Sequence, residues 1–259
     1  MKFTISRQII AISCLLLIVG SGFSQEIIPE EKSGKMKLFI LAGQSNMDGR
    51  GNMEDYEAPE RDENIFVFSK KLEWSIAKEP LTDRGVSPGL SFANELRKND
   101  PDLIIGLIPC AVGGSPINWW QSDFPSRTIY ARMIKQVSLA MEEGELAGVL
   151  FFQGERDAYA DSTSRPDQWA ELFEQFVNDL RKDLNVPDLP VVFAQIGSVE
   201  GLAPKCAIVQ DQQENVKIKN AVMIRTKDLP LQDEWHFTSP AYVEIGKRFA
   251  RKYLKSFNY

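Results

Sequence analysis

Short apolar runs alternate with amphipathic stretches along most of this chain. The runs have the length of β-strands and cover residues 36–42, 65–68, 103–108, 147–152, 190–196 and 221–224. Apolar residues recur at helical spacing in residues 126–142 and, most clearly, in residues 167–184. Strands that alternate with helices of this length are joined by right-handed crossovers, which make neighbouring strands parallel. The pattern therefore predicts an α/β fold with a central parallel sheet covered by helices on both faces.

Two serine-proline pairs mark predicted helix starts. Ser87-Pro88 and Ser239-Pro240 each combine a side chain that caps a helix with a proline suited to the first helical position. We therefore predict helices that begin at both pairs, with Ser87 and Ser239 as their N-caps.

The first residues have the composition of a secretory signal peptide. Basic residues precede an apolar stretch over residues 9–19, and small residues follow it up to Ser24. The apolar stretch is too short to span a bilayer comfortably, so we predict cleavage near Ser24 and no stable membrane insertion afterwards. Residues 1–24 are then the signal peptide, residues 25–259 form a single domain, and the protein is secreted or periplasmic.

Charge limits the partners of this chain. The formal net charge is -6 at pH 7, and loss of Lys2 and Arg7 with the signal peptide makes it more negative still. A chain this acidic is poorly suited to binding nucleic acid or anionic membranes by charge. We therefore expect no nucleic-acid partner.

Cys110 and Cys206 are the cysteines that remain after the signal peptide. They can pair in an oxidising compartment, but Cys110 directly follows an apolar run and we favour its interpretation as a small buried residue. One histidine and two thiols do not make a zinc-type ligand set, and we find no spacing typical of oxygen-only metal sites. The sequence therefore predicts no metal site.

The single histidine, His236, lies three residues after Asp233. Histidine is the side chain whose usual pKa lies near neutrality, so it is the natural candidate for proton transfer. A candidate nucleophile, Ser45, follows the first predicted strand in a turn, at the edge where open parallel sheets bind ligands. The structural alternatives are a histidine satisfied within the fold and a serine that caps the next helix.

Two further loops follow strands at the same edge. The pair Gly113-Gly114 follows the third predicted strand, and paired glycines let a backbone N–H approach a ligand closely, as an oxyanion hole requires. Gln153 and Glu155 follow the fourth strand, where the Gln153 amide offers a neutral donor. Tight turns alone explain most glycine pairs. The functional interpretation depends on the coincidence of these loops with Ser45 at one edge.

Together these motifs resemble the SGNH hydrolases, and more narrowly the sixth carbohydrate esterase family, which includes acetylxylan esterases and overlaps the sialic-acid-specific acetylesterase domain. The matching pieces stand in family order: Gly43-Gln44-Ser45-Asn46-Met47, Gly85-Val86-Ser87-Pro88-Gly89 with Phe92-Ala93-Asn94, Pro109-Cys110-Ala111-Val112-Gly113-Gly114-Ser115, Gln153-Gly154-Glu155, and Leu229-Pro230-Leu231 with Asp233 and His236. Arg156 departs from the family pattern, which usually has serine there, and Phe152 stands where histidine or tyrosine is frequent. Both departures leave the chemistry intact but alter the surroundings of Glu155 or the substrate rim.

This resemblance implies a three-layer α/β/α sandwich of the flavodoxin-like type and a serine esterase mechanism that uses no cofactor. Ser45 is then the nucleophile, and His236 is its base and later the acid for the departing alcohol. Asp233 is the carboxylate that orients the imidazole.

The resemblance also assigns the groups around the reacting ester. The N–H of Ser45, an N–H from Gly113 or Gly114, and the amide of Gln153 are expected to bind the oxyanion. Glu155 is an alternative acid partner for the histidine, or a structural anchor of the serine loop.

Three tryptophans lie beside these motifs, and their faces suit the apolar side of a sugar ring. We predict that Trp119, Trp120 and Trp235 bind substrate, with packing in the core as an equal alternative for Trp120. The expected substrate is an acetylated carbohydrate, with acetyl groups of the xylan type preferred over those of sialic acid.

Two other classes of function stay open on the sequence. One is a glycoside hydrolase that uses carboxylates such as Glu155, Asp157 and Asp233. The other is a sugar-binding module without catalysis that uses the tryptophans.

Overall fold

The computed structural model describes residues 28–126, 128–159, 161–197 and 203–257. These ranges contain a seven-stranded sheet with the strand order β3-β2-β4-β1-β5-β6-β7. In chain order the strands are β1 (Met36–Gly43), β2 (Ile65–Phe68), β3 (Trp74–Ile76), β4 (Ile105–Pro109), β5 (Gly144–Phe152), β6 (Val191–Ala194) and β7 (Ala221–Ile224). Residues 1–24, predicted to form a signal peptide, lie outside the described residues.

All six predicted strands are present, and β2 and β7 have the predicted bounds. Strand β5 begins earlier than predicted, because Gly144 already pairs with Met36 at the start of β1. The prediction of a parallel sheet is correct for these six strands but wrong at one edge, where β3 pairs antiparallel with β2. Strand β3 is short and its side chains are half-buried, so it has no continuous apolar run that reveals it.

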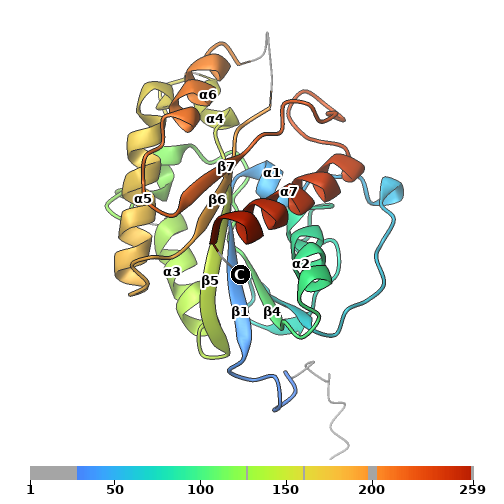
Figure 1. The fold of residues 1–259 in the computed structure, drawn as a ribbon. Helices are drawn as coiled ribbons and strands as arrows, with labels where there is room; N and C mark the ends of the chain where they lie inside the picture. Colours follow the sequence, from blue (N-terminus) through green and yellow to red (C-terminus); the bar gives the residue numbers. More distant parts are fainter. Residues whose placement is uncertain (1–27, 127, 160, 198–202, 258–259) are drawn as a thin grey trace, which may run out of the picture.

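Helices cover both faces of the sheet, which confirms the predicted three-layer α/β/α sandwich (Figure 1). One face carries α2 (Pro88–Asn99) and α7 (Ser239–Phe257), which pack against each other. The opposite face carries α3 (Thr128–Ala140), α5 (Trp169–Asp183) and α6 (Cys206–Glu214). The short helices α1 (Ser45–Asp48) and α4 (Glu155–Ala158) follow β1 and β5 directly.

Aromatic side chains join the sheet to both helical layers. Phe39 of β1 packs edge-on against Phe92 of α2 and Tyr253 of α7, with ring centroids 4.9 and 5.3 Å apart. On the other face Phe151 of β5 packs against Phe176 of α5, with centroids 5.3 Å apart. Such pairs contribute roughly 0.5–1.5 kcal/mol each beyond the burial of their area. The loops at the sheet edge therefore start from firmly packed elements.

Of the two predicted helix starts, one is confirmed and one is displaced. Ser87 caps α2 through its side chain, with a proline at the first helical position. Helix α7 already includes Ser239, and Thr238 accepts the backbone N–H of Ala241 at 3.4 Å. The Ser239 hydroxyl instead donates to a backbone carbonyl 2.6 Å away. The prediction of Ser239 as the N-cap is therefore wrong by one residue.

The loops after β1, β4 and β5 meet at the carboxyl edge of the sheet. The Val112 N–H donates to the carbonyl of Gly43 at 2.9 Å, and the Gln44 N–H donates to the carbonyl of Phe152 at 2.8 Å. These bonds continue the strand pairing into the loops, so the serine turn lies between the other two. None of the helices within the described ranges combines the length and the apolar character needed to cross a membrane.

Candidate active site

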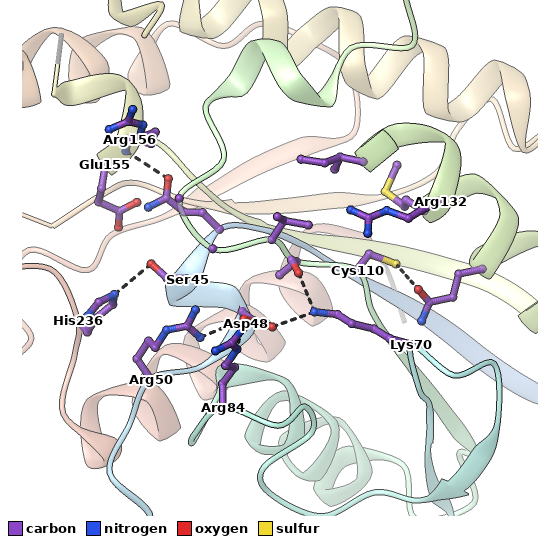
Figure 2. A pocket seen from close by; sticks show the side chains of 18 of the residues that line it. Ser45, Asp48, Arg50, Lys70, Arg84, Cys110, Arg132, Glu155, Arg156 and His236 are labelled. Carbon is purple, nitrogen blue, oxygen red and sulfur yellow. Dashed lines mark hydrogen bonds and ion pairs between the residues drawn. The ribbon is translucent and has the colours of Figure 1, made fainter. Parts of the chain in front are cut away.

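A serine near the start of the chain and a histidine near its end lie in contact (Figure 2). The Nε2 atom of His236 is 3.1 Å from the Oγ atom of Ser45. On the other side of the ring, Nδ1 is 2.8 Å from Oδ2 of Asp233. These are hydrogen-bond distances at which an imidazole can accept a hydroxyl proton. The candidate nucleophile, base and orienting carboxylate thus form one continuous line of side chains.

Asp233 both shapes the histidine loop and orients the ring. Its Oδ1 atom accepts the backbone N–H groups of Trp235 and His236 at 2.7 and 2.8 Å. Partial burial raises the pKa of Asp233, but these donors and the imidazole outweigh it, so the net pKa lies below its ordinary value. The group is therefore a carboxylate at neutral pH, with Oδ2 facing the ring.

The turn that carries the serine depends on a glycine. Gly43, the last residue of β1, has a φ of 128°, a conformation that side chains rarely adopt. A Cβ added to Gly43 would collide with the backbone carbonyl of Phe152 on the neighbouring strand. Only glycine lets the chain turn here while it stays paired to β5, and the next residues then enter α1 with Ser45 at its start.

Asn46 fastens the serine turn to the histidine loop. Its side chain is buried and donates to Oε1 of Glu155 at 2.5 Å and to the carbonyl of Trp235 at 3.0 Å. Its Oδ1 atom accepts the hydroxyl of Tyr242, in α7, at 2.6 Å. This role of Asn46 is not among those predicted from the sequence. The signal available was an amide directly after the candidate nucleophile, in a turn expected to pack against the sheet.

Glu155 belongs to this network through Asn46 and has no hydrogen bond to the histidine in the described structure. Its side chain is buried, and burial raises its pKa to about 7 despite the hydrogen bond from Asn46. Among the described residues, Oε2 has no hydrogen-bond partner and no hydrogen bond joins Glu155 to His236. Of the two roles predicted for Glu155, the geometry favours the anchor of the serine turn.

The glycine loop after β4 lines the pocket next to the serine. A Cβ added to Gly113 would lie 3.9 Å from the Cβ of Ser45 and 2.7 Å from a guanidinium nitrogen of Arg50. Gly114 has a φ of 70° and open space beside it. Within the described ranges the N–H groups of Ser45 and Gly113 have no backbone acceptor. Backbone donors next to a nucleophile are the components of an oxyanion hole.

Gln153 does not lie where the sequence analysis expected it. The side chain is fully buried and does not line the pocket. Its amide N–H groups donate to the carbonyl of Ser115 at 3.0 Å and to Oδ2 of Asp157 at 2.6 Å, and its oxygen accepts from Trp169 at 2.7 Å. The prediction of Gln153 as an oxyanion donor is therefore contradicted, because its donors bind the glycine loop and α4.

The three tryptophans predicted to bind substrate have different surroundings. Trp120 is fully buried and donates to the hydroxyl of Ser115, so it belongs to the core and its predicted contact with substrate is wrong. Trp119 is half-buried, packs near Phe124 and does not line the pocket. Trp235 does line it, stacked on Tyr159 with ring centroids 5.0 Å apart.

The pocket has a volume of about 790 Å³ and includes Ser45 and His236 in its wall. Much of the remaining wall is charged, which the sequence analysis did not predict. These charged residues are Asp48, Arg50, Lys70, Arg84, Arg132, Lys135, Glu155 and Arg156. They stand in short elements and loops or on the exposed side of α3, where a pattern of apolar residues carries no information, and only Glu155 was singled out from the sequence.

Cys110 and Cys206 are buried, and no disulfide joins these two cysteines. This confirms the interpretation of Cys110 as a small buried residue rather than one half of a disulfide. Burial also raises the pKa of the Cys110 thiol to about 12, so it stays protonated although it lines the pocket. Across the described ranges, histidine, cysteine and carboxylate side chains form no cluster of three or more suited to a metal ion.

Comparison with known proteins identifies the class to which this fold and site belong. Residues 35–255 match the family described as carbohydrate esterase, sialic acid-specific acetylesterase. The chain belongs to this family, and it is a carboxylic ester hydrolase. Its relatives include a probable carbohydrate esterase of Arabidopsis thaliana, 35% identical over 245 residues that cover 85% of this chain and 91% of the relative.

Solved structures share the same architecture. The crystal structure of an Arabidopsis thaliana protein matches with a TM-score of 0.77 and 32% identity, over 86% of this chain and 100% of that one. A carbohydrate acetylesterase of Xanthomonas citri matches with a TM-score of 0.66 over 83% of this chain and 55% of its own. Because its identity is 20%, that second likeness supports the fold alone.

Proposed function

We propose that this protein is a secreted or periplasmic serine esterase that removes O-acetyl groups from carbohydrate, with xylan-type oligosaccharides or polysaccharides as its substrates. The observation that carries the proposal is the line of contacts from Ser45 through His236 to Asp233, at 3.1 and 2.8 Å. Carbohydrate acetylesterase activity follows from the family. The signal-peptide pattern of residues 1–24 supports export.

The proposed reaction begins when the Oγ atom of Ser45 attacks the acetyl carbonyl carbon and Nε2 of His236 takes the hydroxyl proton. The tetrahedral intermediate directs its oxyanion at the N–H groups of Ser45 and Gly113, each worth roughly 3 kcal/mol in the transition state. Its collapse breaks the bond to the sugar oxygen, which receives the proton from His236 and leaves as a free hydroxyl. An acetyl group now esterifies the serine.

Water completes the reaction. The neutral imidazole takes a proton from a water molecule, whose oxygen attacks the acetyl carbon. Collapse of the second intermediate returns the proton to the serine oxygen and releases acetate. Asp233 stabilises the imidazolium that forms in each half of the reaction, and it holds the ring in the tautomer that leaves Nε2 free to accept.

The family description favours one second candidate substrate, an O-acetylated sialic acid. A glycoside hydrolase is disfavoured, because Glu155 is buried in contact with Asn46 and Asp157 accepts backbone N–H groups of Ile117 and Arg165. Neither carboxylate is arranged with Asp233 across an open sugar site.

The test uses 4-nitrophenyl acetate and acetylated xylo-oligosaccharides, with release of nitrophenol or acetate as the measurement. We expect Ser45→Ala and His236→Ala each to lower kcat by at least about 10³-fold. Wild-type activity should fall in mild acid, because a protonated imidazole cannot accept the serine proton. Full activity of Ser45→Ala would exclude the serine mechanism, and a wild type that binds glycans but releases no acetate would exclude an esterase.

A further inference from the structure

The pocket has the opposite charge to the chain that builds it. The whole sequence carries a formal charge of -6 at pH 7. The cations in the pocket wall are Arg50, Lys70, Arg84, Arg132, Lys135 and Arg156, whereas its carboxyl groups are Asp48 and Glu155. An excess of cations inside a cavity of an acidic protein concentrates the field there, since low-dielectric walls screen it less than bulk water does.

Three of these cations share one carboxylate. Asp48 is buried, and its oxygens lie 3.0 Å from Arg50, 3.2 Å from Lys70 and 3.9 Å from Arg84. Arg84 also lies 3.6 Å from Asp83, so two carboxylates face three cations. This side of the pocket therefore keeps a positive charge even where its side chains are paired. Arg156 is different, because it forms an ion pair with Asp161.

Arg132 and Lys135 add two more cations from α3. The Nε atom of Arg132 donates to the carbonyl of Thr128 in its own helix at 2.8 Å. In the part of the chain that the structure describes, neither side chain forms an ion pair with a carboxylate. Both are exposed and line the cavity. They are thus charged groups at the cavity wall that serve no ion pair among the described residues.

Arg132 and Lys70 form a cationic end of the pocket away from the serine, whereas Arg50 lies beside it. Figure 2 shows Arg132 and Lys70 on the opposite side of the pocket from Ser45 and His236. At the serine end the wall is aromatic, with Tyr159 stacked on Trp235 and 47% exposed. A volume of about 790 Å³ is far more than an acetyl group needs and lies in the upper range for ligand sites. The cavity accommodates more than one sugar.

We propose that the pocket selects an acidic oligosaccharide, with the acetyl ester at Ser45 and a carboxylate on a neighbouring sugar at Arg132, Lys135 and Lys70. This inference rests on the esterase function and specifies its substrate. A hexuronic acid branch on an acetylated chain provides both groups at this kind of separation. A single O-acetylated sialic acid carries its carboxylate on the same sugar as the ester, so we expect that carboxylate at Arg50, beside Ser45, and not at Arg132 and Lys135.

The test compares three substrates: a neutral acetylated xylo-oligosaccharide, the same oligosaccharide with a glucuronic acid branch, and free O-acetylated N-acetylneuraminic acid. We expect kcat/KM to be about tenfold higher for the branched than for the neutral oligosaccharide, the value of two partly exposed ion pairs. The ratio should fall towards one as NaCl is raised from about 0.02 to 0.5 M, since added salt screens exposed charges.

Two double variants separate the subsite from overall charge. Arg132→Gln with Lys135→Gln should reduce the ratio of acidic to neutral kcat/KM about tenfold. Lys182→Gln with Lys227→Gln removes the same charge from exposed positions that do not line the pocket, and should leave the ratio unchanged. Lys70 is retained, because it also donates to the carbonyl of Ala111 and supports the glycine loop.

Each outcome has a distinct meaning. Equal kcat/KM for the two oligosaccharides, or equal effects of the two double variants on the ratio, would overturn the acidic subsite while leaving the esterase intact. Faster hydrolysis of the free sialic acid ester than of the branched oligosaccharide would overturn the placement of the carboxylate on a second sugar. Calorimetry with the deacetylated oligosaccharides tests binding alone, so tighter binding of the acidic one supports the subsite even if no acetyl ester is hydrolysed.

Discussion

Replacing Asp233 by Asn changes one atom that faces the histidine. The new side chain keeps an oxygen that can accept the N–H groups of Trp235 and His236, now 2.7 and 2.8 Å away, so the loop should keep its shape. In place of Oδ2, however, an NH₂ group faces Nδ1 across 2.8 Å. Two N–H donors cannot face each other. The ring must therefore accept at Nδ1 and carry its proton on Nε2, which points at Ser45.

The expected loss of kcat follows from which ring nitrogen of His236 carries the proton. A protonated Nε2 cannot take the proton of the Ser45 hydroxyl 3.1 Å away, so only the rare opposite tautomer is active. A wrong tautomer in such a triad lowers kcat by roughly 10⁴-fold. At about 1.4 kcal/mol for each factor of ten, the barrier rises by about 5 kcal/mol. The value of KM should change little, because Asp233 does not line the pocket.

The assay is steady-state hydrolysis of 4-nitrophenyl acetate at about pH 8. Glu155→Gln is the matched control, since it also converts a carboxyl group into an amide and keeps an oxygen for Asn46. We expect less than about a tenfold loss from this control, as from an anchor that does not touch the histidine. A large loss in Glu155→Gln together with a small loss in Asp233→Asn would refute the assignment of the orienting acid.

Two further predictions concern stability. Burial raises the pKa of Glu155 to about 7, so the folded state favours the neutral form of this carboxyl group. The wild type should therefore lose folding stability as pH rises from about 4.5 to 7. The difference in unfolding free energy between Glu155→Gln and wild type should shift in favour of the variant by up to about 3 kcal/mol from pH 4 to pH 8. Urea unfolding at both pH values measures this, and an equal difference at the two would contradict it. Asn46→Ala leaves Glu155 and the Tyr242 hydroxyl buried without their partner and should cost about 2–5 kcal/mol, against about 1 kcal/mol for Tyr242→Phe. If chemical denaturation finds both variants as stable as wild type, the network contributes nothing.

The sequence predicted the layers of the fold because those depend on periodicity. Buried strands such as β1 and β5 are apolar on both faces, and α5 repeats its apolar side chains at helical spacing. Strand β3 was not predicted because it is an edge strand with a partner on one side only, and its half-buried side chains form no apolar run. The start of β5 was misplaced for a related reason: its first residues are held by pairing to β1, which a local pattern does not record.

The candidate site was predictable where chemistry restricts the residue type. One histidine left one candidate base, and the glycine at the end of β1 marked the serine turn. The errors arose where one residue type serves two purposes. An amide such as Gln153 suits an oxyanion and a buried hydrogen-bond network equally, and only packing shows that its donors are already bound. The positive charge of the pocket could not be predicted from the sequence, because its cations come from separate segments that only the tertiary structure brings together.

The contacts between the serine turn and the histidine loop make catalysis depend on nearly the whole chain. Ser45 and His236 are separated by 191 positions, and Asn46 reaches Tyr242 in the last helix across 196. Nearly the entire polypeptide must therefore be synthesised before Ser45 can contact His236. Until then Ser45 lacks its base, and the appearance of hydrolysis in a refolding experiment reports the docking of the carboxyl-terminal segment.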